Sequence, residues 1–463
     1  MVKLFNVYYP KRTLQLLVVE STLIILALFG SVLVHFRSEP LAIFRSEIGL
    51  FKIALVAGVC LFFLYYNNLY SPGVVRNPRK IFARFMQGLG IAAVVLALAY
   101  YVIPGLQLYR GFAVTGISLA TVLLISNRAL FSAASRSAEP KKNVIILGEG
   151  AMARLLAKVI QERTELGLNL VGYLGSEWRS DTATETPARL GGLHDLPAIA
   201  RETDVSRVIV AMGDQRGKLP VDDLLALKTS GVTVQDAAEF YEIATGKLPV
   251  GAVRLSWLIF SPGFQVSGMT LFYKRMISVI LAFFGLLLLS PVILLIALAI
   301  RLDSSGPIIF RQRRIGYRGQ PFTLFKFRTM HTNADGGGYA RPAEHNDVRI
   351  TRVGRWLRRF RLDEIPQLYN ILIGHMHFVG PRPFVSEQEF DCAAQIPLYS
   401  YRWSVRPGAT GWAQVQRGYC ASIEDNIDKL SYDLFYIKNM SVGLDLLIIF
   451  KTIKIVLTAQ GGR

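Results

Sequence analysis

Four long apolar stretches open the chain, at about residues 13–34, 50–66, 81–103 and 111–130. Each approaches or exceeds the roughly 20 residues that a membrane helix needs, the second being the shortest. Basic residues precede the first stretch, separate the second from the third and follow the fourth (Lys3, Lys11, Arg12; Arg76, Arg79, Lys80, Arg84; Arg128, Lys141, Lys142). By the positive-inside rule we expect a four-helix transmembrane unit, residues 1–135, with both ends in the cytoplasm. We expect no charged residue deep within these stretches, which argues against an ion pathway.

Between about residues 140 and 255, short apolar runs alternate with helical stretches. Strand-like runs lie at 143–147, 169–174, 207–211 and 232–234. This alternation predicts a Rossmann-like, doubly wound α/β domain. The first run leads into a G-x-G-x-x-A loop containing Gly148 and Gly150, which would let a phosphate approach a helix N-terminus. The second run has no acidic residue at its tip for ribose hydroxyls, and Glu177 follows late, so we favour a regulatory or structural domain over a dehydrogenase.

A fifth apolar run, residues 276–300, is interrupted near its middle by Ser290 and Pro291. Proline removes a backbone donor and favours a kink, and the serine hydroxyl can bond the carbonyl that is freed. Basic residues flank both ends (Lys274, Arg275; Arg301, Arg311, Arg313, Arg314). We therefore expect a re-entrant hairpin over 272–300, a helix–break–helix that enters and leaves one leaflet. An ordinary kinked span is the alternative.

Composition agrees with a membrane location. The chain of 463 residues is 52% hydrophobic, with a mean hydropathy of +0.35. Its net charge of +19 implies anionic partners, and lipid headgroups fit better than nucleic acid because the apolar runs already commit the chain to a bilayer. Residues 301–361 hold fourteen Lys/Arg against four Asp/Glu, a surface suited to headgroups and phosphates. The three cysteines have no C-x-x-C spacing, which argues against a disulfide framework or zinc site.

Asp363 and Glu364 are the leading candidates for chemistry. They follow a run of five arginines (Arg352, Arg355, Arg358, Arg359, Arg361) and precede Pro366. Since proline is tolerated in the first turn of a helix, we expect a helix to start at about Asp363, with Asp363 near its N-cap. The helix dipole and the arginines should then keep Asp363 ionised well below neutral pH, ready to attack a phosphorus atom. The alternative is a capped surface helix with solvated charges.

Other candidate residues surround this segment in the sequence. Lys326 and Arg328 alternate along a strand-like run, which places them on one face. A glycine-rich loop at 335–338 should be mobile, and the two prolines at 381 and 383 hold Arg382 in a stiff turn. The guanidinium fork of Arg382 suits two phosphate oxygens, although a structural turn is an equal alternative. His375 and His377 lack a third ligand at zinc-like spacing, so we interpret them as structural.

Two features near the end of the chain have two interpretations each. Trp412, in a glycine-rich turn, either walls a pocket or belongs to the core. Residues 441–457 form either an amphipathic helix on the membrane surface or a helix packed on the core.

These elements together resemble the bacterial sugar transferase family, the monotopic polyprenyl-phosphate phosphoglycosyl transferases. The matching pieces occur in family order across 268–463: Lys274-Arg275, Ser290-Pro291, and the segments 326–330, 362–368, 380–383 and 407–414. The upstream parts resemble the long form that primes exopolysaccharide or O-antigen synthesis. Residues 415–419 depart from the Asn-Gly-Arg of many relatives, which weakens any inference about the sugar.

The resemblance implies a mixed, mainly helical catalytic domain at 268–463, on the cytoplasmic face of the bacterial inner membrane. A UDP-sugar would donate hexose-1-phosphate to polyprenyl (undecaprenyl) phosphate, with release of UMP. Asp363 would attack the β-phosphate and form a covalent phosphosugar, and Glu364 would assist the lipid phosphate as a base. Mg²⁺ is the expected cofactor, with Asp363 as a ligand. Lys326, Arg328, Arg361 and Arg382 are candidates to bind the phosphates and nucleotide. The sugar, and whether the chain forms a homo-oligomer, stay open.

The sequence leaves two alternative functions. A membrane-anchored NAD-dependent nucleotide-sugar dehydratase would need a Tyr-x-x-x-Lys pair, and none of the 19 tyrosines has a lysine four residues later. A non-catalytic scaffold that binds lipids through its basic face would leave the co-occurrence of the Asp-Glu, Gly-Pro-Arg-Pro and Ser-Pro elements unexplained.

Overall fold

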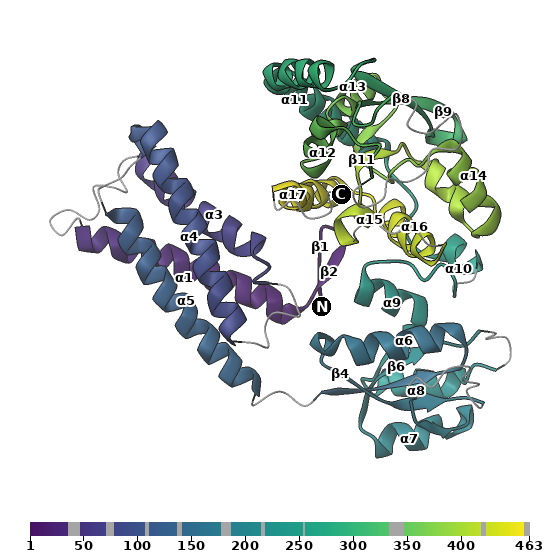
Figure 1. Ribbon diagram of the computed structural model, residues 1–463. Coiled ribbons are helices and arrows are strands. Elements are labelled where there is room, and N and C mark those ends of the chain that lie inside the picture. Colours follow the sequence, from purple (N-terminus) through teal and green to yellow (C-terminus); the bar gives the residue numbers. More distant parts are fainter. Residues whose placement is uncertain are drawn as a thin grey trace. The chain divides into compact units, whose positions relative to one another are not determined.

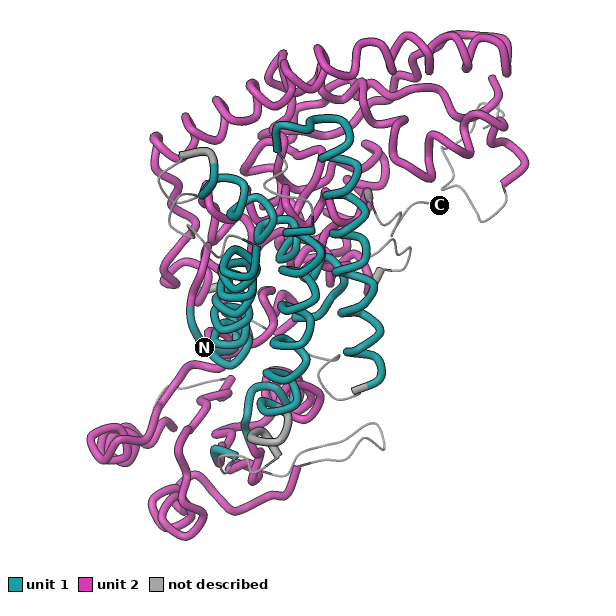
Figure 2. The backbone as a smooth tube through the Cα atoms, turned by 90° about the vertical axis from the view of Figure 1, so that its left-hand side faces the viewer, with its two compact units in different colours: residues 1–2, 9–142, 164–168 teal, residues 3–8, 143–163, 169–463 magenta. Residues whose placement is uncertain are grey.

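A computed structural model describes residues 1–35, 47–70, 78–106, 111–136, 141–176, 187–213, 218–252, 255–332, 347–417 and 423–457. Contacts divide the chain into two compact units (Figure 2). Unit 1 consists of residues 1–2, 9–142 and 164–168, and unit 2 of residues 3–8, 143–163 and 169–463. Arg76, Glu177, the loop at 335–338 and residues 418–419 lie outside the described residues, so the expectations placed on them stay predictions.

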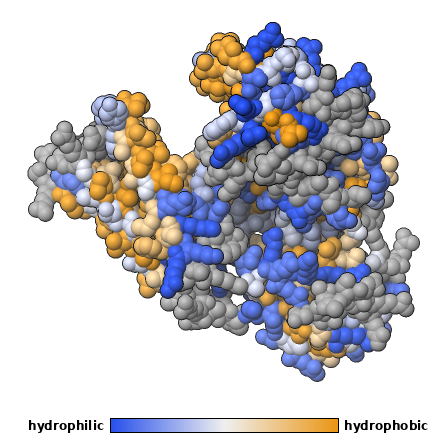
Figure 3. All heavy atoms as spheres, viewed as in Figure 1, coloured by the Kyte–Doolittle hydropathy of each residue, from blue (hydrophilic) through white to orange (hydrophobic). Residues whose placement is uncertain are grey.

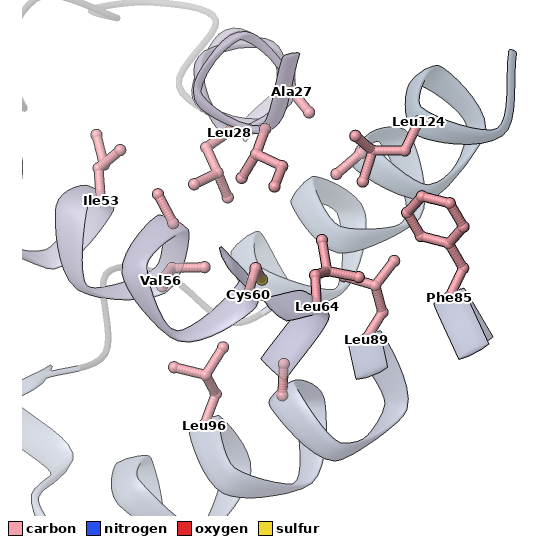
Figure 4. Close-up of a cluster of buried hydrophobic side chains, with 14 of the residues drawn as sticks. Ala27, Leu28, Ile53, Val56, Cys60, Leu64, Phe85, Leu89, Leu96 and Leu124 are labelled. Atoms are coloured by element: carbon pink, nitrogen blue, oxygen red, sulfur yellow. The ribbon is translucent and has the colours of Figure 1, made fainter. Parts of the chain in front are cut away.

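Unit 1 is built from long apolar helices, α1 (Lys11–His35), α3 (Glu47–Tyr66), α4 (Pro78–Val102) and α5 (Phe112–Arg136) (Figure 1). Side chains from all four helices meet in one buried cluster, which includes Leu28, Cys60, Leu89 and Leu124 (Figure 4). Outward-facing positions such as Leu33 and Leu98 are also apolar, each 60% exposed. A helix bundle that is apolar inside and outside is suited to lipid. With α11 of unit 2, five helices of the described chain are long and apolar enough to cross a membrane.

One expectation about unit 1 is wrong, because Glu20 lies well inside α1 and is completely buried. Its carboxylate accepts from Nε of Arg128 on α5, from Nη2 of Arg128 at 3.2 Å and from the hydroxyl of Tyr70 at 2.7 Å. Charges in an apolar bundle are tolerated when they are paired and hydrogen-bonded. The sequence around Glu20 is so apolar that it gives no sign of a buried ion pair, and the partner Arg128 lies 108 positions away in the chain.

The α/β part of unit 2 is a parallel sheet of five strands in the order β5-β4-β3-β6-β7. The strands are β3 (Lys142–Leu147), β4 (Leu168–Leu174), β5 (Arg189–Gly191), β6 (Val205–Val210) and β7 (Thr233–Asp236), accompanied by α6 (Ala151–Glu162), α7 (Leu196–Glu202), α8 (Val221–Thr229) and α9 (Ala237–Thr245). The first strand lies in the middle, as in dinucleotide-binding folds. The expected α/β alternation is confirmed, and β5 is an additional short strand.

Close packing accounts for the first glycine of the predicted phosphate loop. Gly148 has φ +114°, and a Cβ there would lie 2.9 Å from the backbone of Ala211 and Met212 at the end of β6. Gly150 has φ +106° and immediately precedes α6. Both residues thus occupy conformations that favour glycine. Phosphate binding by this loop stays a prediction.

The helix α11 (Gly268–Asp303) is continuous, whereas the sequence predicted a break at Ser290-Pro291. Proline at 291 cannot donate to the carbonyl of Leu287, four residues earlier. The hydroxyl of Ser290 donates to that carbonyl at 2.8 Å instead. The expected role of Ser290 is confirmed. The predicted helix–break–helix is wrong, because the helix continues through Pro291.

The rest of the C-terminal half follows α11 in the chain, and part of it packs against that helix. Its elements are the antiparallel pair β8 (Ile309–Ile315) and β9 (Pro321–Phe327), the parallel pair β10 (His377–Val379) and β11 (Gly408–Thr410), and the helices α12 (Arg352–Arg359), α13 (Gln367–Leu372), α14 (Ser386–Gln395), α15 (Trp412–Gln416), α16 (Ile423–Lys438) and α17 (Val442–Leu457). Two apolar clusters join α11 to this layer, one around Ala282 and Ile371 and one around Ile300 and Leu357. On α17, Leu444 and Ile448 are fully buried, so the core-packed interpretation of that helix is confirmed.

Within unit 2, the sheet and the C-terminal half are joined through the end of α9. Trp412 is 1% exposed, and its Nε1 donates to the carbonyl of Gly246 at 2.8 Å. Lys438 of α16 forms a buried ion pair with Glu242 of α9 at 2.6 Å. Trp412 is therefore part of the core, as one of its two interpretations predicted.

Candidate active site

Asp363 and Glu364 lie on a short 3₁₀ turn, Leu362–Glu364, which follows α12 directly. Arg361 has φ 55° and ψ 23°, a left-handed conformation that turns the chain sharply before the two carboxylates. The α-helix starts only at Gln367, with Pro366 at its N-cap. Asp363 is therefore not an N-cap residue, and that expectation is wrong. The amides of Glu364 and Ile365 bond three residues back, to Arg361 and Leu362, because Pro366 has no N–H with which to extend α13 toward Asp363.

Glu364 is the more strongly paired of the two carboxylates. Arg382 donates from Nη1 to Oε2 at 3.2 Å and from Nη2 to Oε1, which is a two-pronged contact. Lys326 Nζ lies 3.3 Å from Oε1, and Arg361 Nη1 lies 3.9 Å from it. Burial alone would raise the pKa of Glu364, but Arg382, Lys326 and Arg361 hold it well below its usual range. Glu364 is thus a firmly held anion.

Asp363 is 8% exposed and less closely paired, with Oδ2 3.8 Å from Lys326 Nζ. Burial raises the pKa of Asp363 above its usual range, and the adjacent Glu364 adds to the shift. Lys326, Arg358 and Arg382 oppose the shift only in part. The sequence predicted a lowered pKa from the helix dipole and the arginines. That prediction is wrong because burial has the larger effect.

Lys326, which contacts both carboxylates, is positioned by the side chain of Asn370. Asn370 is fully buried in α13; its Nδ2 donates to the carbonyl of Thr323 at 2.7 Å, and its Oδ1 accepts from the amide of Phe325 at 3.0 Å. It therefore bonds to the edge of β9 as a neighbouring strand would. Sequence analysis missed this residue, although a polar residue among the apolar positions of a short helix was a usable signal.

Arg382 reaches Glu364 from a turn that glycine and proline shape. A Cβ at Gly380 would lie 2.6 Å from the carbonyl oxygen of Arg406, so glycine is needed where this turn meets β11. The carbonyl of Arg382 itself accepts from Nη2 of Arg402 at 2.8 Å. The turn that places Arg382 against Glu364 is therefore fixed on its other side by Arg402.

Arg328 does not join this cluster. It is 5% exposed, and its guanidinium donates to the carbonyls of Ser304 and Ser305 at 2.7 and 2.8 Å, just beyond the end of α11. Lys326 and Arg328 therefore have different partners, although the sequence placed them on one face. The prediction that Arg328 contacts phosphate disagrees with this burial.

The other end of α11 is also tied to the domain. Lys274 is 4% exposed and pairs with Asp445 of α17 at 2.7 Å, while Arg275 donates to the carbonyls of Ile371 and Leu372 at the end of α13. These two residues, which the sequence suggested as basic flanks of a membrane segment, fix the helix to its domain.

His377 is buried, and its pKa is lowered to about 3 by burial and by Lys274, Arg406 and Arg275. In the described part of the chain, no three His, Cys, Asp or Glu side chains gather as a metal site. With its pKa lowered in this way, His377 is neutral at physiological pH.

Comparisons with known proteins match two parts of the chain. Residues 269–459 match the family described as bacterial sugar transferase, and residues 66–226 match one described as CoA-binding domain. An Aeromonas hydrophila protein, UDP-N-acetylgalactosamine-undecaprenyl-phosphate N-acetylgalactosaminephosphotransferase, is 40% identical over 239 residues, 50% of this chain and 54% of that one. The chain thus spans about half the length of that relative.

Two further relatives are similar over a larger share of their own length. The Klebsiella pneumoniae UDP-glucose:undecaprenyl-phosphate glucose-1-phosphate transferase is 32% identical over 332 residues, 70% of each chain. The exopolysaccharide production protein PSS of Rhizobium leguminosarum bv. phaseoli is 39% identical over 200 residues, 42% of this chain and all of that one. The motifs that suggested this family, the site that they assemble and these similarities agree: the chain belongs to the bacterial sugar transferase family.

Proposed function

We propose that this protein transfers a hexose-1-phosphate from a UDP-sugar to undecaprenyl phosphate, or another polyprenyl phosphate, and releases UMP. The observation that carries the proposal is the adjacent pair Asp363 and Glu364. One carboxylate is held by Arg382 and Lys326, and the other is buried and more loosely paired. The relatives whose names state this kind of transfer support the choice of substrates.

The chemistry would consist of two displacements at one phosphorus atom. In the first, an oxygen of Asp363 forms a bond to the β-phosphorus, and the bond from that phosphorus to the bridging oxygen breaks, so that UMP leaves with the electron pair. In the second, an oxygen of the lipid phosphate attacks, the bond to Asp363 breaks, and the carboxylate is regenerated. Splitting one transfer into two steps is the advantage of a covalent intermediate.

Glu364 would assist the second step as a base. In the arrangement described here it is a weak base, because Arg382 and Lys326 favour its ionised form. We propose that donor phosphates draw the guanidinium of Arg382 toward themselves, which returns the Glu364 carboxylate to ordinary basicity. Lys326 and Arg361, which lie within 4 Å of Glu364, would neutralise phosphate charge during the transfer.

A divalent cation, Mg²⁺, fits this donor set when the substrate supplies most of the ligands. Mg²⁺ is typically held by one or two carboxylates together with phosphate oxygens, and Asp363 offers one carboxylate that is less strongly paired. When bound, the ion would neutralise charge on the diphosphate. The protein side chains named above bind and orient that diphosphate.

We propose that unit 2 sits on the cytoplasmic face of the bacterial inner membrane, with α11 entering one leaflet. Support comes from the apolar side chains that α11 exposes, among them Leu288, Leu294 and Leu295 at 67–75% exposure. Figure 3 shows a hydrophobic patch at the place where Figure 1 labels α11. Both ends of α11 are bonded to the same domain, through Lys274 and Arg328. A helix fastened at both ends to one domain favours the same side of the bilayer for both ends. A bend at Pro291, where one backbone hydrogen bond of the helix is missing, would let α11 enter and leave one leaflet without a break.

The exposed face of α12 would bind anionic headgroups beside the reacting carboxylates. Trp356 is 63% exposed and stacks on Phe360 with ring centroids 5.8 Å apart. Arg359 lies over both rings, and Arg352 and Arg355 are also exposed. Aromatic rings interleaved with arginines suit the interface between headgroups and acyl chains.

The remaining parts of the chain would have supporting roles. We propose the division 1–135, 140–255 and 268–463, with the first part a four-helix membrane anchor and the second a structural or regulatory domain. The second part carries the loop with Gly148 and Gly150 and contacts the catalytic part through Trp412 and Lys438. Its ligand is a separate question from the transfer reaction.

Release of UMP tests this function. Purified protein in detergent or nanodiscs would be mixed with undecaprenyl phosphate, Mg²⁺ and one UDP-sugar at a time from a panel. We expect UMP and a lipid-linked diphosphosugar to appear in equal amounts. Conversion of a UDP-sugar to its keto form with NAD would favour the dehydratase, and lipid binding without any turnover would favour the scaffold.

A further inference from the structure

Two arginines donate hydrogen bonds to consecutive carbonyls of the turn that carries Arg382. Arg402 donates from Nη2 to the carbonyl of Arg382 at 2.8 Å, and Arg314 donates from Nη1 to the carbonyl of Pro383 at 3.1 Å. Pro381 and Pro383 have no backbone N–H, so this turn cannot be held by a regular hydrogen-bond ladder. Backbone bonds hold only its start, where the amide of Gly380 donates to Thr410 and the carbonyl of Pro381 accepts from Gly408. Side chains from other elements hold residues 382 and 383.

Arg402 is the more deeply buried of the two, at 5% exposure. Its Nε donates to Asp433 at 2.9 Å, and its Nη1 donates to Glu389 at 3.2 Å and to the hydroxyl of Tyr399 at 2.7 Å. Nε and Nη1 thus have three side-chain acceptors between them, and Nη2 has the carbonyl of Arg382. A lysine in this place would keep the charge but could not bond in all these directions at once.

The same network holds the residue that follows the turn. Glu389 Oε1 accepts from the amide of Phe384 at 3.0 Å, and Oε2 accepts from Nε1 of Trp403 at 3.0 Å. The ring of Phe384 lies 4.9 Å from the Arg402 guanidinium carbon. Backbone groups at 382 and 384 are therefore bonded to one buried ion network, whose members come from α14, α16 and the 3₁₀ segment Tyr399–Ser404.

The far side of the turn faces the reacting carboxylates. The guanidinium of Arg382 makes its two-pronged contact with Glu364, a geometry that requires both nitrogens to be correctly placed. A backbone shift of about 1 Å is enough to lose such placement, and shifts of that size can cost about 100-fold in rate.

From these contacts we propose that Arg402 is a positioning residue: it acts through the carbonyl of Arg382 to place the Arg382 guanidinium against Glu364 and, during the reaction, against the donor phosphates. This inference rests on the proposed function for its kinetic consequences. The geometric part, that Arg402 sets the contact between Arg382 and Glu364, stands on the structure alone.

A double-mutant cycle separates this role from a general contribution to folding. Arg402→Lys, Arg382→Gln and the double variant would be compared by kcat/KM for the UDP-sugar, per folded protein. We expect each single variant to lose about 10–100-fold, and the double variant to lose no more than Arg382→Gln alone. Losses that multiply in the double variant would overturn the proposal.

Lys438→Met is the matched control, because Lys438 and Glu242 form another buried ion pair, at 6% and 9% side-chain exposure, that has no contact with Arg382. We expect this variant to lose stability but to keep kcat/KM within about twofold of wild type per folded protein. If Arg402→Lys fails to fold, Tyr399→Phe removes one acceptor of Arg402 without changing any charge. It should show a smaller loss that disappears in the Arg382→Gln background, and a loss that persists there would contradict the proposal.

A second readout does not need activity. Determining the structure of each variant shows directly whether the two-pronged contact between Arg382 and Glu364 is kept. In Arg402→Lys we expect this contact to be lost, and in Lys438→Met we expect it to be unchanged. Loss of the contact in a protein whose wild type releases no UMP would refute the proposed function and keep the positioning role. An unchanged contact in Arg402→Lys would refute the positioning role, whatever the activity.

Discussion

Asp363 and Glu364 are neighbours in the chain, yet the pKa values of their carboxyl groups are shifted in opposite directions. Burial raises the pKa of Asp363, whereas Arg382, Lys326 and Arg361 overcome burial and lower the pKa of Glu364. The ionised form of Asp363 is thus an unfavourable feature of the folded protein, while the ionised form of Glu364 contributes to stability. This difference separates the effects of the two substitutions that neutralise these residues.

Asp363→Asn should abolish transfer without destabilising the protein. The amide cannot form the covalent phosphosugar, and its neutral side chain removes the cost of a buried charge at neutral pH. We expect the free energy of unfolding to be unchanged or higher by about 1 kcal/mol. UMP release, trapping of a labelled phosphosugar and thermal unfolding would be measured on one preparation. Turnover at the wild-type rate would exclude Asp363 as the nucleophile.

Glu364→Gln should lose both turnover and stability. The amide leaves the guanidinium of Arg382 without an anionic partner, and we expect a loss of about 1–3 kcal/mol in the free energy of unfolding. Because Asp363 remains, some phosphosugar adduct should still form from the donor. Adduct can be counted by mass spectrometry of the intact protein, and complete absence of adduct would place Glu364 in the first step instead.

The rate should depend on pH through Asp363. The pKa of Asp363 is raised above the usual aspartate value of about 3.9. As pH falls, the reactive carboxylate is therefore protonated earlier than an ordinary aspartate would be. The raised pKa of Asp363 also stabilises the folded protein at low pH, and this contribution is lost as pH rises through that pKa. The lowered pKa of Glu364 stabilises the folded protein at higher pH, and that contribution is lost as pH falls. A pH profile of kcat/KM should therefore show its acid limb above pH 4. A flat rate down to pH 4 would contradict the raised pKa.

The stability of the membrane bundle should depend on keeping or removing Glu20 and Arg128 together. Glu20→Gln alone leaves Arg128 without its anion, and breaking a buried pair in this way typically costs about 3–5 kcal/mol. The double change Glu20→Leu with Arg128→Met should recover most of that loss. Thermal unfolding in one detergent would compare the three proteins. Equal destabilisation by the single and double changes would show that the two residues act independently.

The topology of α11 can be tested by labelling. In a cysteine-free background, cysteines at Tyr273 and Arg311 should both react with an impermeant reagent from the cytoplasmic side. Ile103, between α4 and α5, is the control for the opposite side. Its own label should come from the periplasm, and labelling of Tyr273 and Arg311 from different sides would refute the re-entrant placement.

What the sequence predicted best were features that short segments determine. Apolar length predicted α1, α3, α4 and α5, and alternating runs predicted β3, β4, β6 and β7. The hydroxyl of Ser290 has the partner that the local geometry of proline requires. Such features depend on residues a few positions apart, so composition and spacing are enough to find them.

What the sequence missed were contacts between distant segments and the balance of opposing forces. The sequence suggested that Arg328 binds phosphate, but its guanidinium donates to carbonyls just beyond the end of α11. Arg402 gave no local signal, because its partners lie on elements up to 31 positions away. The prediction for the pKa of Asp363 used the helix dipole and the nearby arginines, whereas the burial that reverses the direction of the shift exists only in the folded chain.

The anchoring of α11 at both ends has one more consequence. Lys274 ties its beginning and Arg328 its end to the same domain. If α11 enters one leaflet as proposed, it cannot tilt independently of that domain to match a thinner or thicker lipid layer. Any adjustment must move the whole catalytic body, and Asp363 with it, relative to the plane in which lipid phosphates lie. The thickness of the host bilayer thereby becomes a variable of the reaction itself.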